Sequence, residues 1–170
     1  MKKLIFSTAL ILTSITAFSQ KTENFNFGKY PAKIQKSKKA PLKNLSNRVT
    51  KSYAQISKDL YKNTNVNFGG HYVLLNIGST NYETSAVLAD INTGKIYDIP
   101  ENNEAFSPEA IYKCLNDKTF ITKPNSNLLV LHNFEGGEFN SPKRNYYLWN
   151  DKTKKFTLLK TEKLTCKNEN

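Results

Sequence analysis

Apolar residues recur at every third or fourth position in one part of this chain and at every second position in another. Between residues 43 and 62 the apolar positions are four, four, three and four residues apart, at Leu45, Val49, Tyr53, Ile56 and Leu60. At 3.6 residues per turn this spacing puts them on one face, which predicts an amphipathic helix over 43–62. Asn63 and Asn65 then predict its end, because asparagine tolerates the left-handed conformation that often follows a helix.

After Gly70 the period becomes two, which is the period of a β-strand. Val73, Leu75 and Ile77 alternate with other residues and predict a strand over 71–77. The turn sequence Asn92-Thr93-Gly94 predicts a hairpin, since Gly94 can take the positive φ that tight turns require. Further elements follow from the same patterns: strands over 85–91, 95–99, 119–122, 127–134, 144–149 and 155–161, and a short helix from Ser107 to about Leu115.

Short connections between consecutive strands favour antiparallel neighbours. The predicted fold class is therefore α+β, with one N-terminal amphipathic helix packed on a curved antiparallel meander sheet of five to seven strands. Within the last hairpin, alternation puts Tyr147 and Trp149 on one face of the sheet and Tyr146 on the other.

The first 19 residues have the composition of a secretory signal peptide. Lys2 and Lys3 form a positive start, an apolar stretch covers 4–18, and Ala17-Phe18-Ser19 resembles the small residues that precede a cleavage site. We therefore predict export to the periplasm or the outside of a bacterial cell, with no transmembrane segment after cleavage.

The rest of the chain divides into three parts. A lysine-rich leader arm covers 20–42, a single α+β domain covers 43–166, and a short tail covers 167–170. The arm contains aromatic residues that are expected to anchor it on the domain, namely Phe25, Phe27 and Tyr30.

The chain is strongly basic. The predicted signal holds two of the 25 basic residues and none of the 14 acidic ones, so the mature chain would carry a net charge of +9. Lysines are densest over 29–43, and Arg48 and Arg144 are the only arginines. Because arginine is the usual reader of bases and phosphates, nucleic acid is not expected as a partner, whereas a loose attraction to anionic envelope surfaces is.

Cys114 and Cys166 are the only cysteines of the chain. In an oxidising compartment two cysteines of one small domain commonly pair, so our hypothesis is a disulfide between them. A zinc site with His71 and His132 is the weaker alternative, because no CxxC or HxxxH spacing occurs. The sequence predicts no cofactor.

His71 raises the choice between catalysis and structure. It is interpreted either as a general base or ligand at the start of a strand, or as a partly buried ring that bonds the backbone of the preceding turn. In the second interpretation Gly69-Gly70 forms a tight corner between helix and strand, where positive φ or close backbone approach excludes side chains. We favour the corner, because a hydrolase built from His71, Asp90 and a serine would lack the nucleophile elbow and the oxyanion loop.

Several short stretches resemble a family of small exported bacterial proteins. The family pattern is NFAGHY, a cysteine-rich turn, an aliphatic strand that ends in Asp, TGKVY, a Leu-Leu-Val strand and a Tyr-Tyr-x-Trp hairpin. The matching stretches here lie between about residues 45 and 160: Asn67–Tyr72, Ala86–Asp90, Thr93–Tyr97, Leu128–Val130 and Tyr146–Trp149. The resemblance implies export and a compact, mainly β domain. It gives no indication of a catalytic activity. In place of the cysteine-rich turn this chain has Ile77–Tyr82, so no role of those cysteines carries over.

The leading hypothesis is an exported, non-enzymatic protein-binding module of the cell envelope, for example an immunity or inhibitor protein. The alternatives are a small periplasmic hydrolase that uses His71 and Asp90, and a structural envelope protein held by its lysine-rich arm. No catalytic residue is predicted. Tyrosine and arginine often anchor protein interfaces, and two glutamates flank a Gly-Gly loop. The residues proposed for binding are His71, Tyr72, Asp90, Glu135, Glu138, Arg144 and Tyr147.

Overall fold

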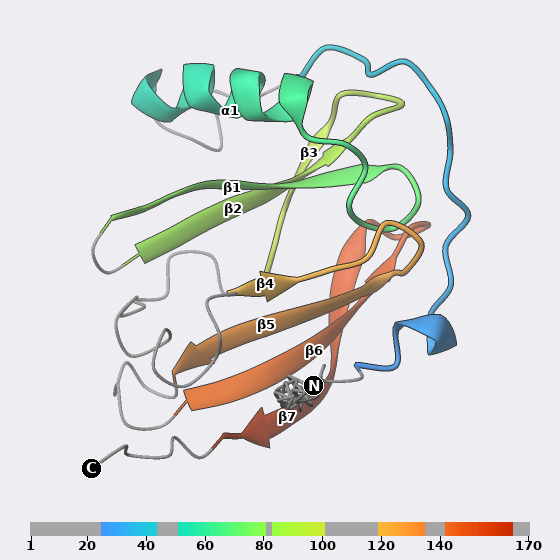
Figure 1. Ribbon diagram of the computed structural model, residues 1–170, viewed down its shortest axis with the longest axis vertical. Helices are drawn as coiled ribbons and strands as arrows, with labels where there is room; N and C mark the ends of the chain where they lie inside the picture. Colours follow the sequence, from blue (N-terminus) through green and yellow to red (C-terminus); the bar gives the residue numbers. More distant parts are fainter. Residues whose placement is uncertain (1–24, 44–50, 81–82, 101–118, 135–141, 165–170) are drawn as a thin grey trace, which may run out of the picture.

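The computed structural model describes residues 25–43, 51–80, 83–100, 119–134 and 142–164. These residues form one α-helix, one 3₁₀ turn and seven strands that divide between two antiparallel sheets. Figure 1 shows them as stacked layers, with the helix above the first sheet and the second sheet below it.

The first sheet has three strands in the order β1-β2-β3: β1 (Tyr72–Thr80), β2 (Glu83–Asp90) and β3 (Ile96–Asp98). The second has four, in the order β4-β5-β6-β7: β4 (Phe120–Ile121), β5 (Leu128–Phe134), β6 (Pro142–Asn150) and β7 (Lys155–Lys163). The expected mainly antiparallel meander of one helix and strands is confirmed, but the expected single sheet is wrong.

The apolar residues of β1 explain why one sheet is not enough. Val73 and Leu75 face the helix, whereas Leu74 faces the second sheet, and all three side chains are buried. A strand that is apolar on both faces needs a covering layer on each side. The helix supplies one layer and the second sheet supplies the other.

The main core lies between the two sheets. Tyr147 and Trp149 of β6 face into this core together, and Tyr146 lies on the opposite face, as alternation predicts. The first sheet and the turn before it contribute further residues, and β5 contributes two leucines: Phe68, Tyr72, Leu74, Leu88, Leu129 and Leu131.

Helix α1 (Lys51–Asn63) lies on the outer face of the first sheet, but the face that it packs agrees only in part with the one that the sequence predicts. Tyr61 is buried against this sheet with Leu60 beside it, and Ser57 is fully buried, whereas 47% of Ile56 is exposed. Tyr61 and Ser57 are four residues apart, so the small serine side chain lies one turn from the tyrosine on the same face. The prediction that Ile56 belongs to the packed face is therefore wrong. The helix also does not begin the fold, because an ordered arm precedes it.

The arm over residues 25–43 begins on the outer face of the second sheet. Phe27 is buried there against Leu128 and Val130, with Phe25 and Tyr30 packed around it. The expectation that these aromatic residues anchor the arm is confirmed. The 3₁₀ turn Phe27–Lys29 lets the chain turn from this face toward the edge of the molecule.

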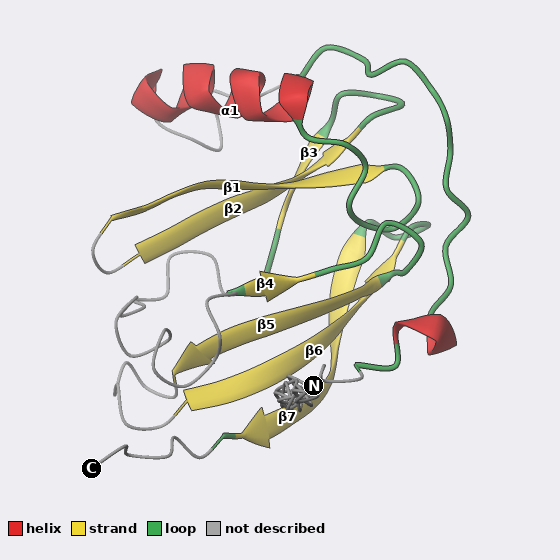
Figure 2. Ribbon diagram, viewed as in Figure 1, coloured by secondary structure: helices red, strands yellow, loops and turns green. Residues whose placement is uncertain are grey.

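From there the arm runs along the side of the molecule to the helix (Figure 2). Its backbone bonds loops next to both sheets, so it ties the two sheets together. These hydrogen bonds run from Ala32 N to Asn125 O at 2.9 Å, from Gln35 N to Gly70 O at 2.8 Å, from Ala40 N to Ile91 O at 2.8 Å and from Lys43 N to Gly94 O at 2.7 Å.

Gly94, in the predicted hairpin turn between β2 and β3, has the expected positive φ of 71°. It has a second role that the sequence does not reveal. A Cβ atom added at Gly94 would lie 1.8 Å from the carbonyl oxygen of Pro41 in the arm. The turn therefore needs glycine both for its conformation and for the close passage of the arm.

Candidate functional site

The Gly69-Gly70 pair forms the corner that the sequence predicts before β1. Both residues have positive φ, 53° and 80°. Their amides donate to the loop before β5, Gly69 N to Ser126 O at 2.9 Å and Gly70 N to Pro124 O at 2.7 Å. A Cβ atom added at Gly70 would lie 2.2 Å from the carbonyl oxygen of Lys33, so the arm also passes directly over this corner.

His71 follows the corner and is 8% exposed. We expected its ring to bond the backbone of the preceding turn. Instead, the ring lies between the arm and the β6–β7 hairpin. Gln35 Nε2 is 3.2 Å from Nδ1, and Asp151 Oδ1 is 3.5 Å from Nε2. Because an amide nitrogen only donates, Nδ1 accepts here, and in the neutral ring the proton sits on Nε2 and faces Asp151.

Asp151 is also the acceptor for two further groups. The hydroxyl of Tyr72 donates to it, and Lys154 Nζ lies 2.8 Å from its Oδ1 and 2.6 Å from the Tyr72 hydroxyl oxygen. Burial raises the pKa of Tyr72 far above its ordinary value, and the bond to Asp151 raises it further. The Tyr72 hydroxyl therefore stays protonated and acts as a donor.

The pKa of Asp151 reflects two opposing effects. Burial alone would raise it, but hydrogen bonds from Lys154 and Tyr72, together with the charge of Lys154, lower it on balance. The carboxylate is thus ionised and shared by three neighbours. This arrangement holds the β6–β7 hairpin against the corner, which is a structural use of all the groups involved.

Asp90 is buried at the end of β2, where its side chain shapes the hairpin. Its two carboxylate oxygens accept from Asn92 N and Thr93 Oγ1, each at 2.8 Å. The described partners of the His71 ring are Gln35 and Asp151, so Asp90 is not the residue that orients it. The pair required by the hydrolase hypothesis does not form.

Arg144 is held inside a second polar cluster, on the outer face of the second sheet. Its Nε donates to His132 Nε2 at 2.9 Å, its Nη1 lies 3.5 Å from Glu162, and its guanidinium stacks on Phe25 at 4.9 Å from the ring centroid. His132, Arg144 and Glu162 are neighbours in register across β5, β6 and β7. Arg144 is 8% exposed, so it supports the sheet and does not anchor a partner.

The remaining predicted residues divide into two groups. Tyr147 lies in the core between the sheets and presents no interface. Glu135, Glu138, Cys114 and Cys166 lie outside the described residues, so the acidic loop and the disulfide stay predictions. The ring centroids of His71 and Tyr72 are 4.2 Å apart at the corner, and Tyr72 shares the core between the sheets with Tyr147. Arg144 lies apart from them, on the outer face of the second sheet.

None of the residues proposed for binding lies in the arm, which presents a basic surface of its own. Six lysines and no acidic residue occur between residues 25 and 43. Five of these lysines are exposed, and so is the isoleucine among them. We call these side chains the arm face: Lys29, Lys33, Ile34, Lys36, Lys38 and Lys43.

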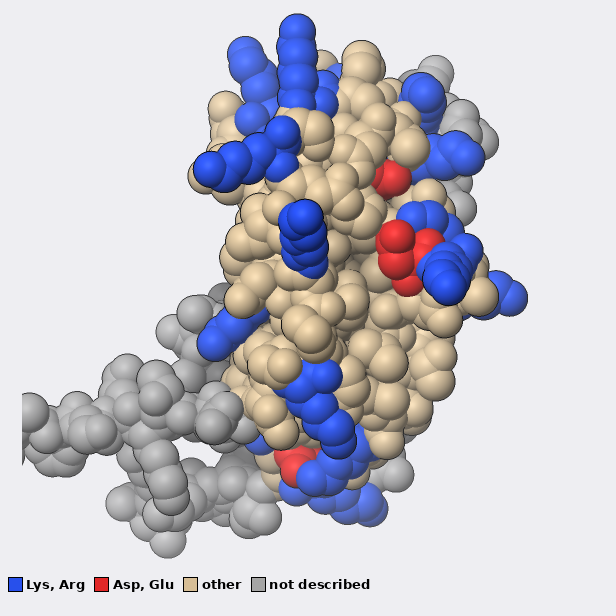
Figure 3. All heavy atoms as spheres, turned by 90° about the vertical axis from the view of Figure 1, so that its right-hand side faces the viewer, with Lys and Arg blue, Asp and Glu red and all other residues tan. Residues whose placement is uncertain are grey.

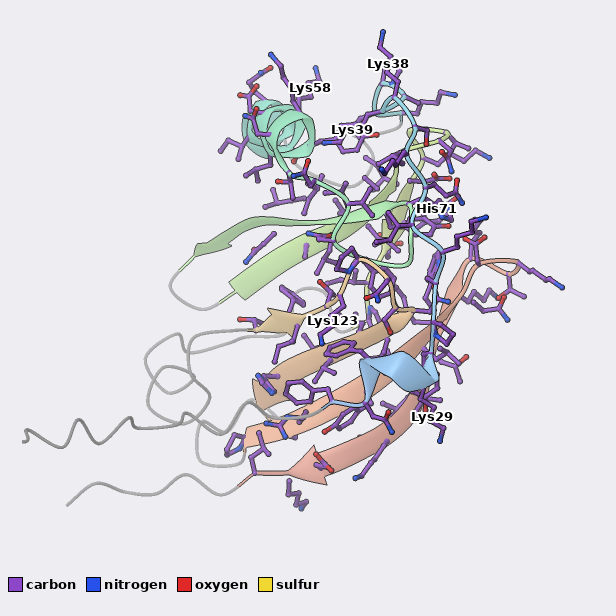
Figure 4. All side chains as sticks on the ribbon, turned by 45° about the vertical axis from the view of Figure 1, so that its right-hand side comes forward. Lys29, Lys38, Lys39, Lys58, His71 and Lys123 are labelled. Atoms are coloured by element: carbon purple, nitrogen blue, oxygen red, sulfur yellow. The ribbon has the colours of Figure 1, made fainter. Side chains whose placement is uncertain are left out.

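The arm face occupies one side of the molecule. In Figure 3, which looks onto this side, lysine side chains project along the molecule from end to end, and acidic groups are few. Figure 4 shows Lys38 and Lys29 toward opposite ends of the arm, with His71 between them. The density of lysine over 29–43 was visible in the sequence, but its fixed geometry was not.

Lys39 differs from the other arm lysines because it points inward. Its ammonium donates to backbone carbonyls at the end of α1, namely those of Tyr61, Lys62 at 3.2 Å and Thr64 at 2.6 Å. Burial lowers the pKa of Lys39. A cation at the carboxyl end of a helix satisfies its free carbonyls, so this lysine joins the arm to the helix.

No family model matches the chain, and no curated protein and no solved structure is significantly similar to it. Among the described residues there is no helix long and apolar enough to cross a membrane, and no group of three side chains suited to hold a metal ion.

Proposed function

We propose that this chain is a non-enzymatic binding protein of the cell envelope, and that it binds through the arm face. The observation that carries the proposal is a fixed backbone that presents a row of exposed lysines. Lys33, Lys36, Lys38 and Lys43 form no ion pair with any described residue, and the backbone that bears them is bonded to both sheets.

Charges of one sign on a fixed segment repel one another, and an anionic partner relieves this repulsion. Because the arm is already ordered, binding would not have to order it, and the free energy of association loses less to chain entropy. The binding partner should therefore be anionic where it contacts this side of the molecule.

A protein partner, such as the target of an immunity or inhibitor protein, would need an acidic patch of matching length. A structural envelope protein held by its lysine-rich arm would use the same surface. The ordering of the arm favours this alternative. The hydrolase is not supported, because Asp90 and His71 each have other partners.

The proposal is tested by the binding of the mature chain, predicted to be residues 20–170, to an envelope preparation. The test variant is Lys33→Glu with Lys36→Glu, and the matched control is Lys58→Glu with Lys62→Glu, two exposed lysines of α1. Both variants change the net charge equally. We expect the arm variant to bind at least about tenfold more weakly, with a much smaller loss in the control.

Equal binding by the wild type and the arm variant would show that the arm face is not the binding surface. Circular dichroism of both variants would establish that each is folded. Binding of the wild type should also weaken as salt is raised from about 0.05 M to about 0.5 M, because the Debye length shortens.

A further inference from the structure

The arm face contains one apolar side chain among its lysines. Ile34 lies between Lys33 and Lys36 in the sequence and is 49% exposed. The backbone on each side of it is held at the corner, because Gln35 N bonds Gly70 O and the Lys33 carbonyl lies against Gly70. Ile34 is therefore exposed from a fixed position and does not belong to a loose tail.

We infer that the anionic partner of the arm face is a lipid bilayer, with the lysines at the level of the lipid phosphates and Ile34 inserted among the headgroups. This inference rests on the proposed function and names the partner. A basic surface with an exposed aliphatic residue combines the two interactions that attach peripheral proteins to anionic membranes, electrostatic attraction and shallow burial of an apolar side chain.

The composition of the arm favours a bilayer over other polyanions. Recognition of nucleic acid relies on arginine and on exposed aromatic rings, but the arm has no arginine. Its aromatic residues Phe25, Phe27 and Tyr30 are packed on the second sheet. The lysine ammonium is a point charge and lacks the planar, bidentate geometry of the arginine guanidinium. It therefore suits a fluid layer of phosphates, in which no phosphate has a fixed position.

The geometry is also consistent with a flat partner. The arm runs along the outside of the molecule and passes both sheets, so its side chains are presented in a row along one side (Figures 2 and 3). Lys123, in the loop before β5, lies beside the start of the arm, with its ammonium over the Phe27 ring at 5.2 Å. Lys95 follows Gly94, which contacts the other end of the arm. Further positive charge thus flanks both ends.

The test is cosedimentation of the mature chain with vesicles. One set contains phosphatidylglycerol and phosphatidylcholine in equal amounts, and the other contains phosphatidylcholine alone. We expect binding to the anionic vesicles only. Reversal of Lys33 and Lys36 should weaken it at least about tenfold, because each basic residue near such a surface contributes an affinity factor of about five.

The contribution of Ile34 is isolated by a pair of serine variants. Ile34→Ser should bind anionic vesicles about threefold to tenfold more weakly, because the inserted aliphatic group is lost. Ile56→Ser is the matched control, because Ile56 belongs to α1 and not to the arm face, and its exposed fraction of 47% is close to that of Ile34. It should bind as the wild type does.

Two results would overturn the inference. If envelope binding depends on the arm lysines but anionic vesicles do not bind, the partner is another polyanion, and the proposed function stands without a bilayer. If the wild type binds anionic vesicles and the two serine variants bind equally, Ile34 does not insert. Loss of arm dependence in the envelope assay would instead reject the proposed function itself.

Discussion

At the scale of single residues, glycine determines where the arm crosses the domain. Gly70 and Gly94 both have positive φ. At each of them, a backbone carbonyl of the arm occupies the space that a Cβ atom would need. The sequence predicted positive φ at Gly94, and at Gly70 it left positive φ and close backbone approach as alternatives without naming what approaches. The steric reason needs the position of a segment about 35 to 55 residues earlier in the chain, which no local pattern contains.

Gly70→Ala is expected to destabilise the protein by roughly 2 to 4 kcal/mol, because it adds strain at positive φ to a backbone clash. Gly28→Ala is the matched control, since a Cβ atom at Gly28 would meet nothing within 4 Å. It should change the free energy of unfolding by less than about 0.5 kcal/mol. Urea denaturation measures both, and equal effects would contradict the close crossing at Gly70.

Asp151 gives stability a defined dependence on pH. Its folded pKa lies below the ordinary value of 3.8, so its contribution is present above that pH and is lost as the pH falls through the folded pKa. Asp151→Asn should therefore lower the melting temperature at neutral pH. The effect should be modest, at most about 1 kcal/mol, because half of this side chain is exposed.

The difference in melting temperature between Asp151→Asn and the wild type should shrink as the pH falls below 3.8, and it should vanish once the pH lies below the folded pKa of Asp151, where the wild-type carboxyl is also neutral. Lys154→Met should cause a similar loss at neutral pH, and the double variant should add little to it. A difference that stays constant down to acidic pH would mean that the charge of Asp151 is not what stabilises the hairpin.

At the scale of elements, the strand periods predicted more than the helix period did. The bounds predicted for the strands lie within a few residues of the observed ones. A period of two leaves only two faces for each strand, so the inward and outward residues follow once the strand is located. Side chains point in all directions around a helix, so either of two neighbouring apolar stripes can form the packed face. In α1 the stripe that contains Tyr61 and Ser57 is buried, and the stripe that contains Ile56 is not.

The helix face is tested by comparing two substitutions on α1. Tyr61→Ala should destabilise the protein by about 3 to 5 kcal/mol, because it removes a buried ring and the bond from its hydroxyl to Ala40 O. Ile56→Ala should cost less than about 1 kcal/mol. Thermal unfolding of both variants decides the face, and the reverse order of stability would restore the face predicted from the sequence.

At the scale of the whole molecule, the arm is a structural layer as well as a binding surface. Phe25, Phe27 and Tyr30 cover the outer face of the second sheet, and the backbone beyond them bonds the first sheet and its turns. The arm therefore links the two sheets along one side of the molecule. Five of its six lysines are exposed, because its aromatic side chains and backbone bonds are directed inward.

Phe27→Ala is expected to destabilise the protein by about 3 kcal/mol and to loosen the start of the arm. Limited proteolysis should then cleave the arm at its lysines faster than in the wild type. If cleavage of the arm is unchanged in Phe27→Ala, the aromatic anchor does not hold it.

The sequence by itself determined the order and approximate bounds of the strands, the hairpin at Asn92–Gly94, the corner at Gly69-Gly70 and the common face of Tyr147 and Trp149. These features depend on local conformation and on alternation, which neighbouring residues encode. Only the tertiary structure decided the division into two sheets, the packed face of α1, the partners of His71 and the course of the arm. Each of these depends on contacts between segments far apart in the chain, and their geometry is set by which buried surfaces fit together.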